Sequence, residues 1–240
     1  MTIAEVPSVV ASFDRSILLY VNQFAGRDRT VDLLIFHLAD LNLLKGVLFM
    51  ACAWYFWFGR KGVNRADVVG LISIALLAVV VGRLLQLGLP GRLRPINEPT
   101  LALALPGHAR PDVLRDWSSF PSDHAILFFA MAAALAPISR LLAGVAAVWA
   151  AVVVCLPRLY LGYHYASDLI VGAIIGTTVA FLFLRLTPRR LTESVAGLAD
   201  RWPGPFYASA FVLTYGVGIL MADMRQLAMQ ALKFLQVVAA

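Results

Sequence analysis

The sequence predicts an all-α fold, a polytopic membrane helical bundle with about six transmembrane helices and interfacial helices at both ends. Hydrophobic residues make up 60% of the 240 positions and charged residues 14%, whereas soluble domains average about 45–50% and about 25%. The mean hydropathy is +0.79. Apolar runs of about 20 residues, long enough for a helix to cross a bilayer, recur along the chain.

Three regions follow in order. Residues 1–30 place apolar side chains at helical spacing with charges opposite, which predicts an interfacial N-terminal helix. Residues 31–222 form the predicted transmembrane domain. Residues 223–240 form an amphipathic tail, either interfacial or loosely spanning. The six predicted spans begin near Val31, Val68, Pro121, Leu141, Ser167 and Phe206.

Two other features of the sequence concern the arrangement of the spans. Residues 88–118 form a long segment with five prolines, which disfavours helix there. The fifth predicted span contains Gly172 and Gly176, a pair of small residues four apart that permits close helix packing.

The distribution of charge suggests partners and orientation. The formal net charge is +6, but the basic residues are scattered, which favours anionic lipid and phosphate over nucleic acid. Loops 59–67, 136–140 and 185–205 share one predicted side and carry eight Lys/Arg against three acids. The positive-inside rule places that side in the cytoplasm of an inner membrane, with the opposite face toward the periplasm or outside. No feature indicates an oligomeric state.

Three polar motifs fall on that opposite face, each at the end of a predicted span. They lie within residues 91–95, 119–124 and 157–168. A helical bundle would bring the three ends together, so we expect one site rather than three separate polar patches.

The histidines suggest a reaction. His164 and Asp168 are four residues apart, so a helix beginning between them would let the carboxylate orient the imidazole. We expect His164 to be the nucleophile. We expect His124 to protonate the leaving group and then to activate water.

The other polar residues suggest that the reacting group is phosphate. Arg94 and Arg158 can make bidentate contacts with phosphate oxygens. Ser122 begins the third span, where unpaired backbone N–H groups and a hydroxyl can bind an anion. No cluster has the usual spacing of metal ligands, so we expect neither a metal nor another cofactor.

The chain resembles the type 2 phosphatidic acid phosphatase superfamily over about residues 66–184. The matching elements are Arg94-Pro95, Pro121-Ser122-x-His124 and Arg158-x5-His164-x3-Asp168. The resemblance implies a membrane lipid phosphatase with a helical core. It also implies a phosphohistidine intermediate at His164.

Three positions depart from the family pattern, one of them Pro157, where the family has serine before Arg158. The family lysine is Leu87 here, and either Arg92 or Arg83 could supply the missing cation. The family glycine is Asp123, whose carboxylate would repel phosphate unless it were paired, for which Arg92 is the candidate. We include Arg92 and Asp123 in the expected phosphate-binding set, with helix capping as the other interpretation of Asp123.

The expected function is hydrolysis of a lipid phosphate or diphosphate. The resemblance, together with the length of the chain, favours undecaprenyl diphosphate, converted to the monophosphate. Phosphatidylglycerophosphate, phosphatidate and lipid A phosphate are the competing substrates. A non-catalytic lipid-phosphate binder or transporter is the alternative from another class, motivated by the departures at positions 87 and 123.

Overall fold

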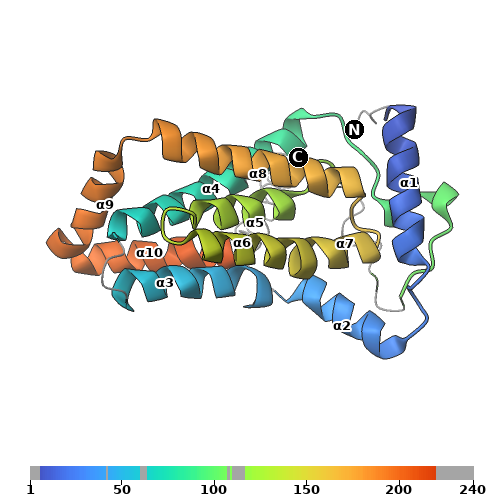
Figure 1. Cartoon of the computed structure of the whole chain (residues 1–240), viewed down its shortest axis with the longest axis horizontal. Coiled ribbons are helices and arrows are strands. Elements are labelled where there is room, and N and C mark those ends of the chain that lie inside the picture. The colour runs from blue at the N-terminus through green and yellow to red at the C-terminus, as the bar shows by residue number, and fades with distance from the viewer. Residues whose placement is uncertain (1–5, 42, 60–63, 107–108, 110–116, 220–240) are drawn as a thin grey trace, which may run out of the picture.

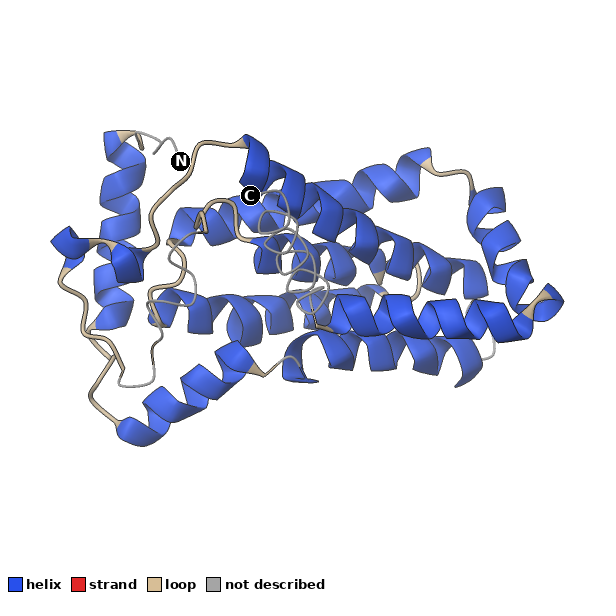
Figure 2. Cartoon of the chain, turned by 180° about the vertical axis from the view of Figure 1, so that it is seen from behind, coloured by secondary structure: helices blue, strands red, loops and turns tan. Residues whose placement is uncertain are grey.

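The computed structural model describes residues 6–41, 43–59, 64–106, 109 and 117–219. Within these ranges the chain is a bundle of helices without a β-strand (Figures 1 and 2). The predicted all-α membrane fold is therefore confirmed. The predicted amphipathic tail, 223–240, lies outside the described residues.

The helices follow one another through short connections, apart from the largely irregular segment between α4 and α5. Their bounds are α1 Ser8–Asn22, α2 Arg29–Asp40, η1 Leu43–Val47, α3 Leu48–Gly59, α4 Arg65–Gly88, η2 Pro95–Asn97, η3 Pro99–Leu101, α5 Asp123–Ala134, α6 Arg140–Trp149, η5 Ala150–Cys155, α7 Leu156–Tyr160, α8 Ala166–Leu186, α9 Arg189–Arg201 and α10 Pro203–Gly218. Here η1 and η5 are π-helical turns, and η2 and η3 are 3₁₀ turns.

Helix α5 is the centre of the bundle. It is apolar on all sides, which is the composition of a helix with no solvent face. Ile126, Phe128 and Met131 point in different directions around it, yet each is 0% exposed. Helices α4, α6 and α8 pack around it (Figure 1). The start of α5 is thereby held in place by three neighbouring helices.

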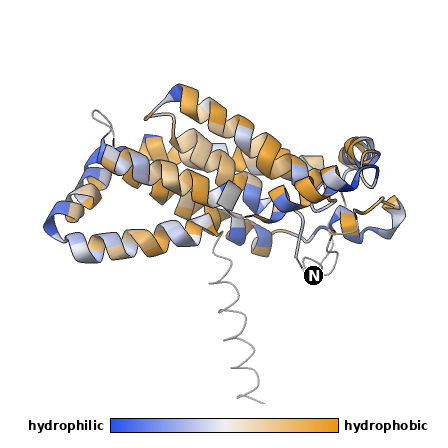
Figure 3. Ribbon diagram, turned by 90° about the horizontal axis from the view of Figure 1, so that it is seen from below, coloured by the Kyte–Doolittle hydropathy of each residue, from blue (hydrophilic) through white to orange (hydrophobic). Residues whose placement is uncertain are grey.

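The long helices have the dimensions of membrane spans. Three helical stretches, at 65–88, 140–160 and 166–186, are long and apolar enough to cross a bilayer. A fourth span results if α2 and α3 are counted as one broken span, bent by 55°. Helix α5 has 12 residues and α10 has 16, so both are shorter than these spans. Hydrophobic residues cover the long helices, and hydrophilic ones gather toward their ends (Figure 3).

Helices α5 and α8 approach closely at the two predicted small residues. A Cβ at Gly172 would lie 2.8 Å from the carbonyl oxygen of Ser122. A Cβ at Gly176 would overlap the carbonyl oxygen of Ile126. The glycines therefore let the two backbones touch, and this contact sets the distance between the motif residues that begin each helix.

The two ends of the bundle differ. Helix α9 lies at one end, where the sequence had suggested only a basic link (Figure 1). Helices α1 and α7 and the beginning of α8 lie at the other end. Helix α1 buries Asp14, Leu18 and Asn22, at successive four-residue intervals on one face, against α7 and α8. Its predicted location at the membrane interface stays a prediction.

Candidate active site

Backbone hydrogen bonds join the three motifs at the α1 end of the bundle. The N–H of Ser119 donates to the carbonyl of Arg92 over 2.9 Å, which pairs the first motif with the second. The N–H of Ser122 donates to the carbonyl of Asp168 over 3.2 Å, which links the second to the third. The N–H of Ile96, next to the first motif, donates to the carbonyl of Gly162 in the third motif over 2.8 Å. The predicted convergence of these segments is present.

His164 is held in one tautomer. Its ring is 2% exposed, Nδ1 lies 2.8 Å from the carbonyl oxygen of Ser119, and Nε2 lies 3.3 Å from Nη1 of Arg94. A carbonyl only accepts and a guanidinium only donates, so the proton belongs on Nδ1 and the lone pair on Nε2. Burial, followed by the charge of Arg94, lowers the pKa of His164, which further favours the neutral ring.

Asp168 anchors the segment that carries His164. Its Oδ2 accepts from the N–H of Tyr165 over 2.8 Å at the start of α8, and its Oδ1 pairs with Arg92 at 2.7 Å. Nδ1 of His164 is 3.8 Å from Oδ2, farther than from Ser119. The carbonyl of Ser119 is therefore the nearer orienting group. The sequence could not identify it, because a backbone acceptor has no side-chain signature.

Backbone carbonyls hold the two arginines expected to bind phosphate. Arg94 is 5% exposed and donates to the carbonyl oxygens of Tyr163, Ser118 and Trp117. Arg158 is also 5% exposed, and its Nη1 donates to the carbonyl of Val154 over 2.8 Å. A neutral acceptor fixes a guanidinium without cancelling its charge, so such an arginine stays attractive to an anion.

The start of α5 has an arrangement that the sequence analysis did not predict. Ser122 caps the helix: it is 0% exposed, and its Oγ accepts from the N–H of Ala125 over 3.4 Å. Oδ1 of Asp123 lies 2.8 Å from Nδ1 of His124, and Oδ2 lies 3.1 Å from Nη2 of Arg83. The expected pairing of Asp123 with Arg92 is wrong, because Arg83, one turn before position 87 on α4, is its partner.

Arg92 joins α1 to α8. Its Nη2 lies 2.7 Å from Asp14, its Nη1 lies 2.7 Å from Asp168, and its guanidinium stacks 3.9 Å above the ring of Tyr165. Ser167 also accepts a hydrogen bond from it over 2.9 Å. Two buried carboxylates thus neutralise the arginine that we expected to contact phosphate. Asp14 was not in the predicted set, although a charge in an apolar helix is a recognisable signal.

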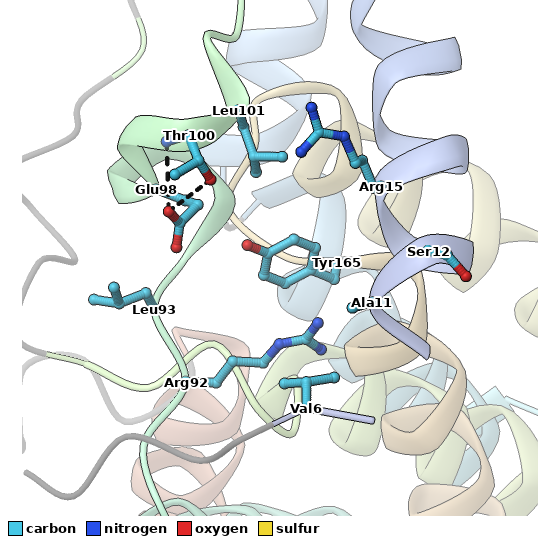
Figure 4. Close-up of a pocket in the computed structure, with 10 residues that line it drawn as sticks. All are labelled: Val6, Ala11, Ser12, Arg15, Arg92, Leu93, Glu98, Thr100, Leu101 and Tyr165. Atoms are coloured by element: carbon cyan, nitrogen blue, oxygen red, sulfur yellow. Dashed lines mark hydrogen bonds between the residues drawn. The ribbon is translucent and has the colours of Figure 1, made fainter. Parts of the chain in front are cut away.

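A pocket of about 350 Å³ opens beside this network, between α1 and the turns at 95–101 (Figure 4). Tyr165 lies near its centre, and Arg92 and Arg15 reach it from opposite sides. Neither His124 nor His164 lines it. The pocket therefore lies apart from the two histidines. In the described part of the chain, no group of three His, Cys, Asp or Glu side chains could hold a metal ion.

The protein is thus an all-helical membrane protein whose histidines and arginines gather at one end of the bundle. Residues 91–192, which hold most of the candidate site, match the family described as the PAP2 superfamily. This range includes every motif residue named above from Arg92 to Asp168.

A curated relative matches about half of the chain. The chain is 31% identical over 142 residues to a lipid A 1-diphosphate synthase of Escherichia coli (strain K12), covering 55% of this chain and 57% of the relative. The chain thus spans little more than half the length of this curated relative.

Two solved structures share the fold. The crystal structure of LpxE from Aquifex aeolicus has a TM-score of 0.55 and 23% identity, over 77% of this chain and 99% of the other. A transmembrane PAP2-type phosphatidylglycerolphosphate phosphatase from Bacillus subtilis has a TM-score of 0.50 and 21% identity, over 75% of this chain and 86% of the other.

Proposed function

We propose that the chain is an integral membrane phosphatase that acts on a lipid phosphate or diphosphate through a phosphohistidine at His164. The observation that carries this proposal is the fixed tautomer of His164. With its proton held on Nδ1 by Ser119, the ring presents an unprotonated Nε2 beside the charge of Arg94. A neutral, oriented imidazole next to a cation is the arrangement that nucleophilic attack on phosphorus requires.

The reaction proceeds in two balanced steps. Nε2 of His164 forms a bond to phosphorus, the bond from phosphorus to the leaving oxygen breaks, and the imidazolium form of His124 gives its Nε2 proton to that oxygen. Water then attacks phosphorus, His124 takes a proton from it, and the phosphorus–nitrogen bond breaks. Arg94 and Arg158 stabilise the negative charge that develops on the phosphoryl oxygens. Ser122 adds a hydroxyl and the first N–H groups of α5.

Undecaprenyl diphosphate, cleaved to the monophosphate at the periplasmic face of the inner membrane, is the substrate that we propose. The resemblance of the motifs supports this substrate, and the excess of basic residues in the loops at the opposite end supports the orientation. Phosphatidylglycerophosphate, phosphatidate and lipid A phosphate remain the alternatives.

A second candidate is phosphoryl transfer to a lipid acceptor instead of water. The observation that favours it is the relative whose name describes the synthesis of lipid A 1-diphosphate. A phosphohistidine can be discharged by either acceptor, so the same site residues serve both reactions. The acceptor present in the second step decides between them.

Phosphate release by the full-length protein in detergent tests the proposal. The substrates are diphosphates and monophosphates of several lipids, each assayed with the unmutated protein and with His164→Ala. We expect release with the unmutated protein and its loss with His164→Ala. Release from no substrate would favour the non-catalytic binder. Addition of lipid A 1-phosphate to labelled undecaprenyl diphosphate separates the two acceptors, because label appears either in free phosphate or in lipid A.

A further inference from the structure

Lys45 is a buried cation that the proposed reaction has not used. It lies in the π-helical turn η1, where the chain bends between α2 and α3. Its side chain is 2% exposed and is among the largest fully buried side chains of the described residues. Single π-turns interrupt helices frequently at functional sites. A lysine is seldom buried to this degree without a partner of opposite charge.

The contacts of Lys45 bring it to the site arginine. Its Nζ donates to the carbonyl oxygen of Ala39 over 2.6 Å. The same oxygen lies 3.5 Å from Nη2 of Arg158. Two cations from distant parts of the chain therefore converge on a single acceptor.

The nearby negative charge does not balance them. Within the described residues, neither Lys45 nor Arg158 has a carboxylate within ion-pair distance. Asp40 and Asp123 act on Lys45 only through longer-range electrostatics, and Asp123 already pairs with Arg83. Ala39 lies in the last turn of α2, whose partial charge amounts to roughly −0.5. The carbonyl of Ala39 is thus the acceptor that Lys45 and Arg158 share, and no carboxylate among the described residues pairs with either of them.

We propose that Lys45 and Arg158 together form an anion subsite and that Lys45 binds the phosphate of the substrate. This inference rests on the proposed function and extends it. At the position of the family lysine this chain has Leu87, which is 76% exposed. Lys45 supplies a cation that this position lacks. A lysine ammonium has three donors, and Ala39 takes one, so two remain for phosphate oxygens.

The alternative role for Lys45 is structural, as a donor that caps the end of α2. The turn itself is tightly packed, since a Cβ at Gly46 would overlap the carbonyl oxygen of Gly218. Two substitutions separate the roles. Lys45→Met removes both charge and donor, whereas Lys45→Gln removes the charge and keeps a donor for Ala39. Arg190→Gln, on exposed α9 at the other end, controls for net charge.

The experiment measures thermal unfolding of the full-length variants with and without inorganic phosphate at constant ionic strength, together with lipid phosphate hydrolysis. We expect phosphate to raise the melting temperature of the unmutated protein and of Arg190→Gln, but of neither Lys45 variant. Without phosphate, both Lys45 variants should melt at or above the unmutated protein, because each replaces a buried lysine that has no ion-pair partner among the described residues. Their kcat/KM should fall about ten- to a hundredfold.

The outcomes separate this inference from the proposed function. One outcome is that phosphate raises the melting temperature only when Lys45 is present, in a protein that hydrolyses no lipid phosphate. That result would support the subsite and overturn the proposed phosphatase activity. Hydrolysis and a phosphate shift that both persist in Lys45→Met and Lys45→Gln would overturn the subsite and leave the phosphatase intact. A lower melting temperature in Lys45→Met alone, with the phosphate shift unchanged, would make Lys45 a cap.

Discussion

Asp123 holds the imidazole of His124 through a 2.8 Å hydrogen bond between its Oδ1 and Nδ1 of the ring. Its second oxygen is held by Arg83 at 3.1 Å, so the carboxylate is itself fixed. The bond assigns a proton to Nδ1 and leaves Nε2 of His124 for proton transfer. A residue that departs from the family pattern thus acts as a positioning residue for the proposed acid.

Substitution of Asp123 should therefore slow turnover more than it weakens binding. Asp123→Asn keeps the shape but loses the charged acceptor, and we expect kcat to fall about tenfold or more while KM changes little. Steady-state kinetics on the preferred lipid phosphate measures both. Asp67→Asn, which changes an acid in the first turn of α4 at the opposite end, is the matched control and should leave kcat unchanged. Equal kcat in both variants would contradict the positioning role.

Loss of Arg92 should destabilise the fold, because it leaves Asp14 and Asp168 buried without their cation. Breaking a buried pair by removing one partner costs about 3–5 kcal/mol. We expect Arg92→Met to lower the free energy of unfolding by about that amount, measured by denaturant unfolding in detergent.

The double variant Arg92→Met/Asp14→Asn tests the cause, because it removes one of the two stranded charges. We expect it to recover part of the lost stability. A fully stable Arg92→Met that has lost phosphate affinity would instead make Arg92 the phosphate ligand predicted from the sequence.

The pH dependence of the reaction should follow the protonation of His164. Burial and Arg94 lower the pKa of His164 below the usual 6.5, whereas Asp168 acts to raise it. The neutral ring is the nucleophile, so the acid limb of the rate profile should lie below pH 6.5. Asp168→Asn removes the raising influence and should move the limb to lower pH. Arg94→Gln removes a lowering influence and should move it to higher pH. Limbs that move the other way would exclude His164 as the titrating group.

The pH dependence of the free energy of unfolding should reflect the same lowered pKa of His164. The folded pKa of His164 is lower than the unfolded one, so the unfolded chain binds the extra proton first as the pH falls. The contribution of neutral His164 to stability is therefore present above about pH 6.5 and lost as the pH falls through the folded pKa. His164→Asn should flatten this part of the curve of unfolding free energy against pH, and an unchanged slope would contradict the assignment.

The contact between α5 and α8 should tolerate no side chain at Gly176. A Cβ there would overlap the carbonyl oxygen of Ile126, and overpacking of this kind costs about 1–3 kcal/mol. We expect Gly176→Ala to lower the melting temperature and, by displacing the start of α5, to reduce kcat. Gly144→Ala is the matched control, since its Cβ would meet nothing within 4 Å. Equal melting temperatures for the two variants would show that the helices are not in close contact.

The sequence predicted the fold class and the convergence of the motifs because both depend on local pattern. Apolar runs identified the long helices, and Gly172 and Gly176 indicated the close packing of α5 and α8. The partners of the polar residues were harder to predict. Arg83 pairs with Asp123, and Arg92 pairs with Asp14, since side chains choose partners across the bundle rather than along the chain.

Two features lay beyond any sequence pattern. The carbonyl of Ser119 orients His164, but a backbone oxygen is the same at every position. Lys45 lies in a π-helical turn at the bend between α2 and α3, and hydrophobic periodicity does not reveal such a turn.

The central claim is that Nε2 of His164 carries the phosphoryl group. The most direct measurement mixes a lipid substrate, labelled in the transferred phosphate, with the full-length protein, denatures the mixture rapidly at alkaline pH and locates the label by peptide analysis. We predict acid-labile label on His164, absent from His164→Ala and accumulating in His124→Ala if water activation fails. Turnover of the substrate with no label on His164, or with label on another residue, would contradict the account.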